Sequence, residues 1–269
     1  MLLSNLHTHT VFSDGKQTPR ENVEAALARG FVSIGISDHS YTDFDLRYCM
    51  RAEKVDEYLA TIRALKEEYA GRIEVYAGLE YDGYTDLVVG REAFDYLLGD
   101  CHYIKTSGGY FSVDHCKEGH EALCNDWFGG DYTAFAKAYF EGYTACMQSI
   151  RPDVLGHFDL VSKFCLTDES SHAYRRYATE ALIDCLAVTP LIELNTGAIA
   201  RGHRAVPYPA PYLWKEVAAH GGKFVFGSDS HDIANLDFYF AECAALLKQN
   251  GIRSVAVLKN GAFQEVGLD

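Results

Sequence analysis

The sequence predicts an α/β fold in which seven parallel strands and their following helices close into a barrel within a single domain. Short apolar runs alternate seven times with helical segments, a pattern typical of parallel strands joined by crossover helices. Residues able to bind metal ions stand where these runs end. A barrel brings the carboxyl ends of all its strands to one face, whereas an open sheet does not. No glycine-rich nucleotide-binding motif follows a strand, which further disfavours an open sheet.

The helices are predicted from their end signals and apolar spacing. Thr18, Pro19 and Glu21 form a capping box that begins the first helix, and Gly30 ends it. A second helix is expected near residues 52–70, followed by Gly71. Further helices are expected at residues 91–96, 131–150, 171–188, 211–222 and 237–251.

The strands are predicted from short runs rich in β-branched and aromatic residues. The first leads into residues 7–9, and the others are expected at residues 31–37, 73–81, 96–104, 153–161, 190–196 and 223–231. The segment 106–130 is only weakly patterned and is expected to be irregular. It either covers a substrate near the site or is an ordinary surface excursion.

Composition limits the classes of function. The 269 residues fit one domain over 1–269, since barrels of this length are commonly undivided. The formal net charge is −14 and the cations do not cluster, which argues against binding of long nucleic acids or anionic membranes. The eight cysteines contain no C-x-x-C pair, and the N-terminal stretch does not resemble a signal peptide. We therefore expect a cytoplasmic protein with reduced thiols; the sequence does not indicate an oligomeric state.

The strand ends carry a set of metal-capable side chains. They are His7, His9, His39, Glu80, His102, His157, Asp229 and His231, and Asp14 lies in the first loop. A single histidine of this kind is more simply interpreted as a hydrogen-bonded residue, but the whole set indicates a metal centre. Imidazole and carboxylate ligands suit zinc, iron or manganese, and the lack of cysteine argues against a closed structural zinc site. The remaining histidines, at positions 115, 120, 172, 203 and 220, are interpreted as structural or solvated.

The order of the motifs resembles that of the polymerase-and-histidinol-phosphatase (PHP) superfamily. The series is HTHTVFSDG, SDHS, GLEYDG, GDCH, GHFD and GSDSHD, between residues 6 and 232. The segment IELNTGAIARGHR and the chain length are most similar to bacterial histidinol-phosphate phosphatases. This resemblance implies a distorted, TIM-like (β/α)7 barrel that holds three metal ions.

The resemblance also implies how the ligands are shared. One ion would bind His7, His9, Glu80 and Asp229, a second would share Glu80 and add His102 and His157, and a third would bind Asp14, His39 and His231. The expected cofactors are therefore two to three divalent ions, zinc or alternatively iron or manganese. Two such ions close together hold a bridging hydroxide that attacks phosphorus, and they neutralise the phosphoryl oxygens.

Four further residues are expected near the substrate or the ligands. Lys163 and Arg201 follow neighbouring strands and are expected to bind phosphate, although solvated loop cations are the alternative. Asp38 and Asp159 are expected to orient the adjacent ligand histidines.

The metal-capable residues, together with the resemblance, predict a metal-dependent phosphomonoester hydrolase. The resemblance implies that its small phosphorylated substrate is L-histidinol phosphate, which water would convert to L-histidinol and phosphate in histidine biosynthesis. The alternatives are a PHP-type phosphoesterase acting on nucleotides or oligonucleotide ends and a non-catalytic metal-binding regulatory domain. The full set of nine ligands disfavours the regulatory domain.

Overall fold

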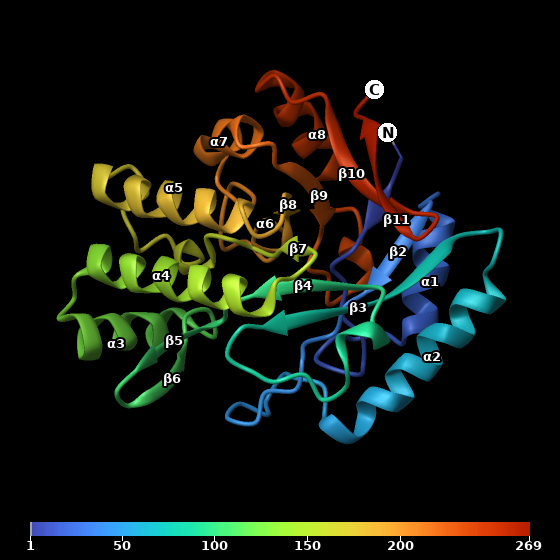
Figure 1. Ribbon diagram of the computed structural model, residues 1–269, viewed down its shortest axis with the longest axis horizontal. Coiled ribbons are helices and arrows are strands. Elements are labelled where there is room, and N and C mark those ends of the chain that lie inside the picture. Colours follow the sequence, from blue (N-terminus) through green and yellow to red (C-terminus); the bar gives the residue numbers. More distant parts are fainter. Residues whose placement is uncertain (1) are drawn as a thin grey trace.

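The computed structural model describes residues 2–269, and the seven predicted strands form one parallel sheet in it (Figure 1). In sheet order they are β1 Ser4–Asn5, β2 Ser33–Ile36, β3 Glu74–Asp82, β4 Tyr96–Asp100, β7 Val154–Leu155, β8 Leu191–Asn195 and β9 Lys223–Gly227. The two outer strands approach each other, because Thr8 and Ser230 form a parallel bridge and the Leu6 amide donates to the Phe226 carbonyl at 3.4 Å. The sheet is thus a nearly closed barrel, and the predicted fold class is confirmed.

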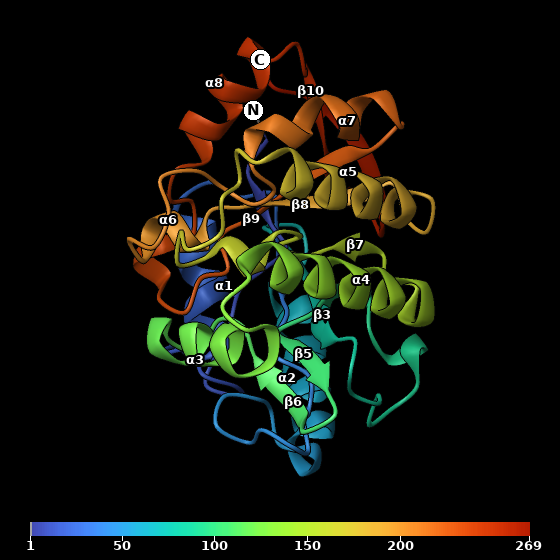
Figure 2. The ribbon, with the colours of Figure 1, turned by 90° about the vertical axis from the view of Figure 1, so that its left-hand side faces the viewer.

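Eight α-helices lie in the described part of the chain (Figures 1 and 2). They are α1 Pro19–Ala28, α2 Val55–Glu68, α3 Lys117–Phe128, α4 Tyr132–Ile150, α5 His172–Leu186, α6 Gly197–Ala200, α7 Trp214–Ala219 and α8 Phe240–Gln249. Most of them lie on the outside of the sheet, whereas α3 packs on α4 and α6 follows the end of β8. Short 3-10 turns occupy Ala52–Lys54, Arg91–Ala93, Leu160–Ser162, Pro211–Leu213 and Ile233–Asn235. The predicted capping box begins α1: Thr18 accepts from the Glu21 amide, and the Glu21 carboxylate accepts from the Thr18 amide.

Several predicted elements are shorter in the structure. The run 153–161 forms a strand only at β7, because Asp159 leaves the β region (φ −105°, ψ 41°) and a 3-10 turn follows. The expected helix at 91–96 is a single 3-10 turn, and β4 replaces its last residue.

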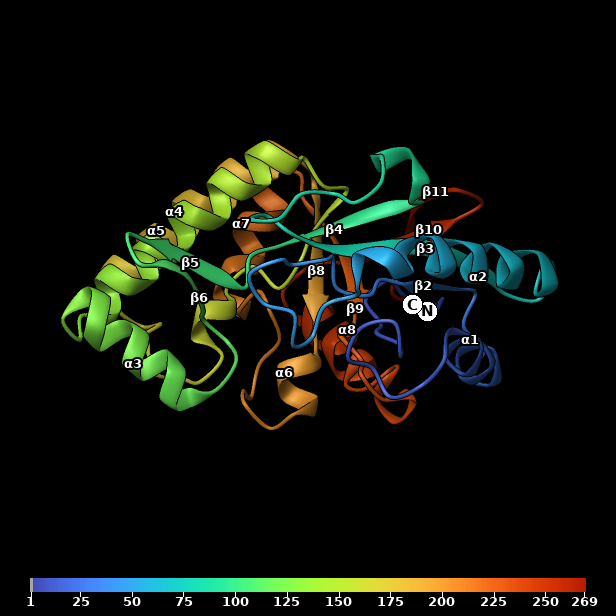
Figure 3. The ribbon, with the colours of Figure 1, turned by 90° about the horizontal axis from the view of Figure 1, so that it is seen from below.

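The prediction that segment 106–130 is irregular was wrong. Strands β5 Tyr103–Thr106 and β6 Gly109–Ser112 form an antiparallel hairpin, and α3 follows it. This hairpin–helix insert, residues 103–128, lies beside α4 and away from β2 and β3 (Figure 3). Some of its apolar contacts are local, such as Phe111 against Trp127 with ring centroids 5.5 Å apart, and others reach distant parts of the chain, such as Tyr110 against Phe44 at 4.4 Å. It lacks the long apolar periodicity that reveals barrel elements.

A C-terminal hairpin, which the sequence pattern did not reveal, covers the amino-terminal end of the barrel. It consists of β10 Ser254–Lys259 and β11 Ala262–Gly267 and lies near both chain termini (Figure 1). The Asn260 amide donates to the Glu74 carboxylate at 2.6 Å, at the start of β3, and Lys223 at the start of β9 forms an ion pair with Glu265. The opposite end of the barrel, where the strands finish, is left for the site.

A tyrosine fills the barrel interior. Tyr96 is fully buried and donates its hydroxyl proton to the Leu6 carbonyl. Glycines on the neighbouring strands β2 and β3 leave space for this side chain. A Cβ atom at Gly35 would lie 2.0 Å from the Tyr96 hydroxyl oxygen, and one at Gly78 would lie 2.2 Å from Tyr96 Cζ. No helix within residues 2–269 has both the length and the apolar character needed to cross a membrane.

This packing predicts a coupled pair of substitutions. Gly78→Ala should destabilise the fold by about 1–3 kcal/mol, because the added methyl group overlaps the Tyr96 ring. In the double variant Gly78→Ala/Tyr96→Leu the overlap is gone, so chemical denaturation should give less than the sum of the two single effects. Gly267→Ala is the matched control, since a Cβ there meets nothing within 4 Å. Strict additivity would contradict the packing described.

Candidate metal centre

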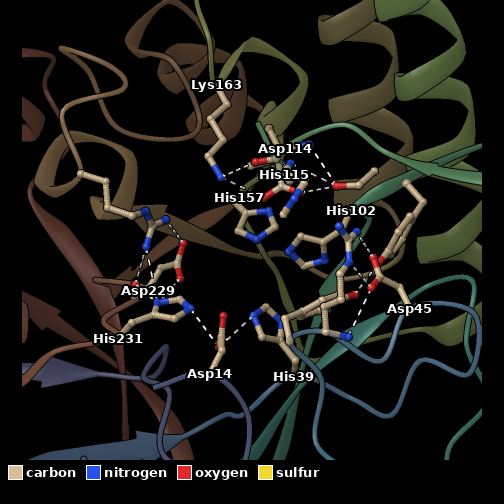
Figure 4. Close-up of a pocket in the computed structure, with 16 residues that line it drawn as sticks. Asp14, His39, Asp45, His102, Asp114, His115, His157, Lys163, Asp229 and His231 are labelled. Atoms are coloured by element: carbon tan, nitrogen blue, oxygen red, sulfur yellow. Dashed lines mark hydrogen bonds and ion pairs between the residues drawn. The ribbon is translucent and has the colours of Figure 1, made fainter. Parts of the chain in front are cut away.

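The strand ends bring the nine predicted ligands together around one cavity of about 480 Å³ (Figure 4). Six of them line it directly: Asp14, His39, His102, His157, Asp229 and His231. The other three, His7, His9 and Glu80, lie deeper and are almost completely buried. The ligand set therefore extends from the open cavity into the top of the barrel.

Glu80, at the carboxyl end of β3, is the centre of this arrangement. Five imidazoles contact its carboxylate, although only 1% of the residue is exposed. From Oε1, the nitrogens of His157, His7 and His102 lie at 2.9, 3.3 and 3.3 Å, and from Oε2 those of His39 and His9 lie at 2.5 and 3.5 Å. Glu80 therefore stands between the predicted ligands of the first and second ions.

The other predicted groups are also gathered. His7, His9 and Asp229 present ligand atoms within 4.8 Å of one another, as do His9, Asp14, His39 and His231. Asp14, His39 and His231 are the predicted ligands of the third ion and lie in the second of these groups, the outer group. Asp14 Oδ1 is 3.1 Å from His231 Nε2 and 3.7 Å from His39 Nε2. His9 belongs to both groups and so connects them.

Unpartnered buried atoms show that the site suits a cation. His7 Nε2 and both ring nitrogens of His9 are buried without a hydrogen-bond partner among residues 2–269. Such atoms cost free energy when they are left unsatisfied. Imidazole nitrogens and carboxylate oxygens are the donors that zinc and similar divalent ions bind, so the residues present fit the metal ions that the sequence implied.

The electrostatics of the site also favour a cation. Burial opposes the ionisation of Glu80, yet His39 and His7 hold its pKa well below the usual value. Arg201 and His7 do the same for the pKa of Asp229. Burial and the neighbouring imidazoles of His231 and His39 lower the pKa of His9 to about 3, so this ring is neutral, as a metal ligand must be.

Three carboxylates that the sequence analysis did not single out hold the far sides of the ligand imidazoles. Glu193 Oε1 lies 2.7 Å from His7 Nδ1, Asp82 Oδ2 lies 3.2 Å from His102 Nδ1, and Asp100 Oδ1 lies 2.9 Å from His157 Nδ1. Contacts of this kind fix the ring orientation and tautomer of metal-bound histidine. A signal for them was present, because residues two apart on a strand share a face: Asp82 follows Glu80 and Asp100 precedes His102 at that spacing.

The predicted orienting role of Asp38 and Asp159 needs correction. Asp38 accepts hydrogen bonds from the amide and hydroxyl of Thr10 (2.8 and 2.7 Å) and from the Ser13 amide, so it holds the loop between two ligands rather than an imidazole. Asp159 accepts from the Ala210 amide at 3.0 Å and lies 3.8 Å from Arg204. Both carboxylates support the backbone around the site.

Lys163 and Arg201 line the cavity, but each already has an anionic partner. Lys163 Nζ donates to Asp114 Oδ2 and to the Asp114 carbonyl, both at 2.9 Å. Arg201 Nη2 donates to Asp229 Oδ2 at 2.6 Å and Nη1 to the Asp229 carbonyl at 2.9 Å. The alternative of solvated loop cations does not fit these contacts, and phosphate binding stays a prediction.

Two loops contribute cavity residues that sequence reasoning missed. Asp45, Arg47, Tyr48 and Tyr103 line the cavity, and so does His115, which was interpreted as outside the site. Ser112 and Asp114 also line it, and they lie in segment 106–130, for which covering the substrate was one of the two expected roles. His120 is buried, with Nδ1 2.6 Å from the Val113 carbonyl, which agrees with its structural interpretation. The missed residues come from the 41–48 loop and the hairpin–helix insert, whose positions depend on contacts distant in the sequence.

Comparison with known proteins identifies similar chains. Residues 5–197 match the model of the PHP domain family. A Deinococcus radiodurans protein named "Probable histidinol-phosphatase" is 32% identical over 263 residues, covering 94% of this chain and 95% of its own. The histidinol-phosphatase of Bacillus subtilis is 23% identical, covering 87% and 95%. The structure of histidinol phosphate phosphatase from Lactococcus lactis, complexed with zinc, L-histidinol and phosphate, aligns with a TM-score of 0.73 at 20% identity over 97% of this chain and 98% of that one.

The contact between Glu193 and His7 predicts a loss of metal affinity on mutation. Glu193→Gln should weaken binding of the ion that His7 is predicted to hold by about 10- to 100-fold, because His7 loses the anion that orients it. Gly227→Ala should act similarly, since its Cβ would lie 1.8 Å from Glu193 Oε1. Competition with a chelator of known affinity measures the change, and Glu180→Gln on the surface of α5 is the control. Unaltered affinity in both variants would refute the orienting role.

The position of Glu80 predicts the pattern of metal loss. The purified chain should carry two to three divalent ions, and removing them with a chelator should lower the melting temperature, because ions bind the native state. Glu80→Gln should lose more metal than Asp14→Asn, because Glu80 contacts ligands of two predicted ions and Asp14 those of the outer group. Elemental analysis measures the metal content of each variant. A Glu80→Gln protein with the wild-type metal content would disprove that Glu80 is shared by two ions.

Proposed function

Because the chain belongs to the PHP domain family, we propose that it is a metal-dependent phosphomonoester hydrolase that converts L-histidinol phosphate and water to L-histidinol and phosphate. The observation that carries this proposal is the buried Glu80 carboxylate with its five imidazoles, which lies beneath a cavity whose lining includes Lys163 and Arg201. The substrate is supported by the names of the Deinococcus and Bacillus relatives and by the ligands of the Lactococcus structure.

The ligand groups define what the chain contributes to this reaction. His7, His9, Glu80 and Asp229 would hold one ion, Glu80 with His102 and His157 a second, and Asp14, His39 and His231 a third. Bound divalent ions, for which we propose zinc with iron and manganese as alternatives, supply an activated water and neutralise phosphoryl oxygens. The three orienting carboxylates keep the imidazoles aimed at them.

Lys163 and Arg201 would hold the phosphoryl group. Lys163 and Arg201 lie in the same cavity as six of the ligands and already bind carboxylate oxygens there, so their charge and direction suit phosphate oxygens. Lys163 uses two of its three ammonium protons on Asp114 and keeps one for substrate. A cytoplasmic location, expected from the sequence, remains part of this proposal.

A substrate comparison tests the function. The metal-loaded protein should hydrolyse L-histidinol phosphate with a higher kcat/KM than AMP, a 5′-phosphorylated oligonucleotide or other simple phosphomonoesters. Phosphate release measures turnover, and the Glu80→Gln protein is the control for contaminating phosphatase. A preference for the nucleotides would favour the nucleotide-directed alternative. The absence of turnover on every phosphoester, with metal bound, would favour the regulatory domain.

A further inference from the structure

We propose that Asp114 binds the ammonium group of the substrate and thereby selects amino-bearing phosphomonoesters. This inference rests on the proposed function, because it names the substrate feature that the same cavity recognises. Asp114 lies at the end of the insert's hairpin, between β6 and α3, and faces the cavity beside Lys163 (Figure 4).

Four carboxylates line the described cavity: Asp14, Asp45, Asp114 and Asp229. Asp14 and Asp229 belong to the ligand groups. Asp45 is held by its own loop, because Arg47 donates Nε to Oδ1 at 2.8 Å and Nη2 to Oδ2 at 2.6 Å. Asp114 is therefore the lining carboxylate that is neither a proposed ligand nor clamped by a guanidinium.

The contacts of Asp114 leave it able to accept more hydrogen bonds. Lys163 donates to Oδ2 at 2.9 Å and the Ser112 hydroxyl donates to Oδ1 at 3.1 Å, so each oxygen keeps a further lone pair. Although burial opposes its ionisation, Lys163 and His102 hold the pKa of Asp114 below the usual value. The side chain is thus an anion at neutral pH with room for a cationic partner.

Binding of phosphate strengthens this site for a cation. In the structure the charge of Lys163 is balanced by Asp114. A phosphoryl group on the remaining Lys163 proton shares that positive charge and leaves the Asp114 carboxylate less compensated. An ammonium group that arrives with the same substrate restores the balance, because it forms a charge-assisted hydrogen bond.

The chemistry of the proposed substrate matches this juxtaposition. In L-histidinol phosphate the amine is borne on the carbon next to the phosphorylated carbon, so it lies close to the phosphoryl group. Asp114 is hydrogen-bonded directly to Lys163, which is proposed to bind the phosphate. A substrate held by its phosphate at Lys163 consequently presents its ammonium group near Asp114.

The test compares two substrates that differ only in the amine: L-histidinol phosphate and 3-(imidazol-4-yl)propyl phosphate. Asp114→Asn should lower kcat/KM for the first by about tenfold to a hundredfold, as expected for one charge-assisted hydrogen bond. The loss should lie mainly in KM, because the amine does not change during the reaction. The deamino substrate should be little affected. Asp126→Asn, on the exposed face of α3 in the same insert, is the control for the change in charge.

A binding measurement provides a readout that is independent of turnover. Calorimetry should show weaker binding of L-histidinol to Asp114→Asn than to wild type, with the deamino alcohol, 3-(imidazol-4-yl)propan-1-ol, bound equally by both proteins. Metal content and melting temperature establish that the variant is folded. Asp114→Ser serves as a second variant if the asparagine protein does not fold.

The outcomes separate the inference from the proposed function. Failure of wild type to hydrolyse L-histidinol phosphate would overturn both. If wild type hydrolyses it but the Asp114 variants lose the two substrates equally, Asp114 has only a structural role. An amine-specific loss in Asp45→Asn instead of the Asp114 variants would assign the ammonium group to the other carboxylate. An amine-specific loss confined to the Asp114 variants supports the inference.

Discussion

The structure depends on keeping one buried carboxylate ionised. Glu80 is 1% exposed, and an isolated anion at such a position is costly enough to be protonated or to disrupt the fold. Five imidazoles from several strand ends surround it, and three further carboxylates lie behind those rings. Because these groups lie far apart in the sequence, the network forms only when the barrel closes. Closure of the sheet and assembly of the site are therefore one event.

The strands that carry these groups are short, and other elements hold them in place. β1 and β7 contain two residues each, so their few backbone hydrogen bonds contribute little to closure. Tyr96 fills the interior between glycines of two neighbouring strands, and the C-terminal hairpin packs across the starts of β3 and β9. The amino-terminal half of the barrel is thus an apolar, tightly packed support. Because this half holds the strands in place, the carboxyl-terminal half of the barrel can contain many charged groups.

The sequence revealed those parts of the molecule whose signals are local. A polar residue at the end of an apolar run indicated eight of the nine ligands, Asp14 in the first loop being the exception, and closure of a barrel implied that the ligands meet. The same alternation indicates Asp82 and Asp100, whose spacing of two residues from a ligand was not used. The hairpin–helix insert was not predictable in this way, because its segment has no clear apolar periodicity. The pairing of Lys163 with Asp114 was not predictable either, because the two residues are 49 positions apart in the sequence. Asp38 was correctly placed near the site, but its partners, Thr10 and Ser13, are set by the shape of a loop.

The proposed metal ligands and the proposed ammonium-binding residue belong to separate parts of the chain, the barrel and the hairpin–helix insert. The ligands and their supporting carboxylates belong to the barrel strands and the turns that follow them, whereas Asp114 and several other cavity residues belong to a segment packed mainly on α4. The two strands of that segment pair with each other and not with a barrel strand. Such a protein can acquire a preference for a different phosphoester by remodelling one surface module while its reaction chemistry is inherited unchanged. The insert is accordingly the place to begin when redesigning this scaffold for a new substrate.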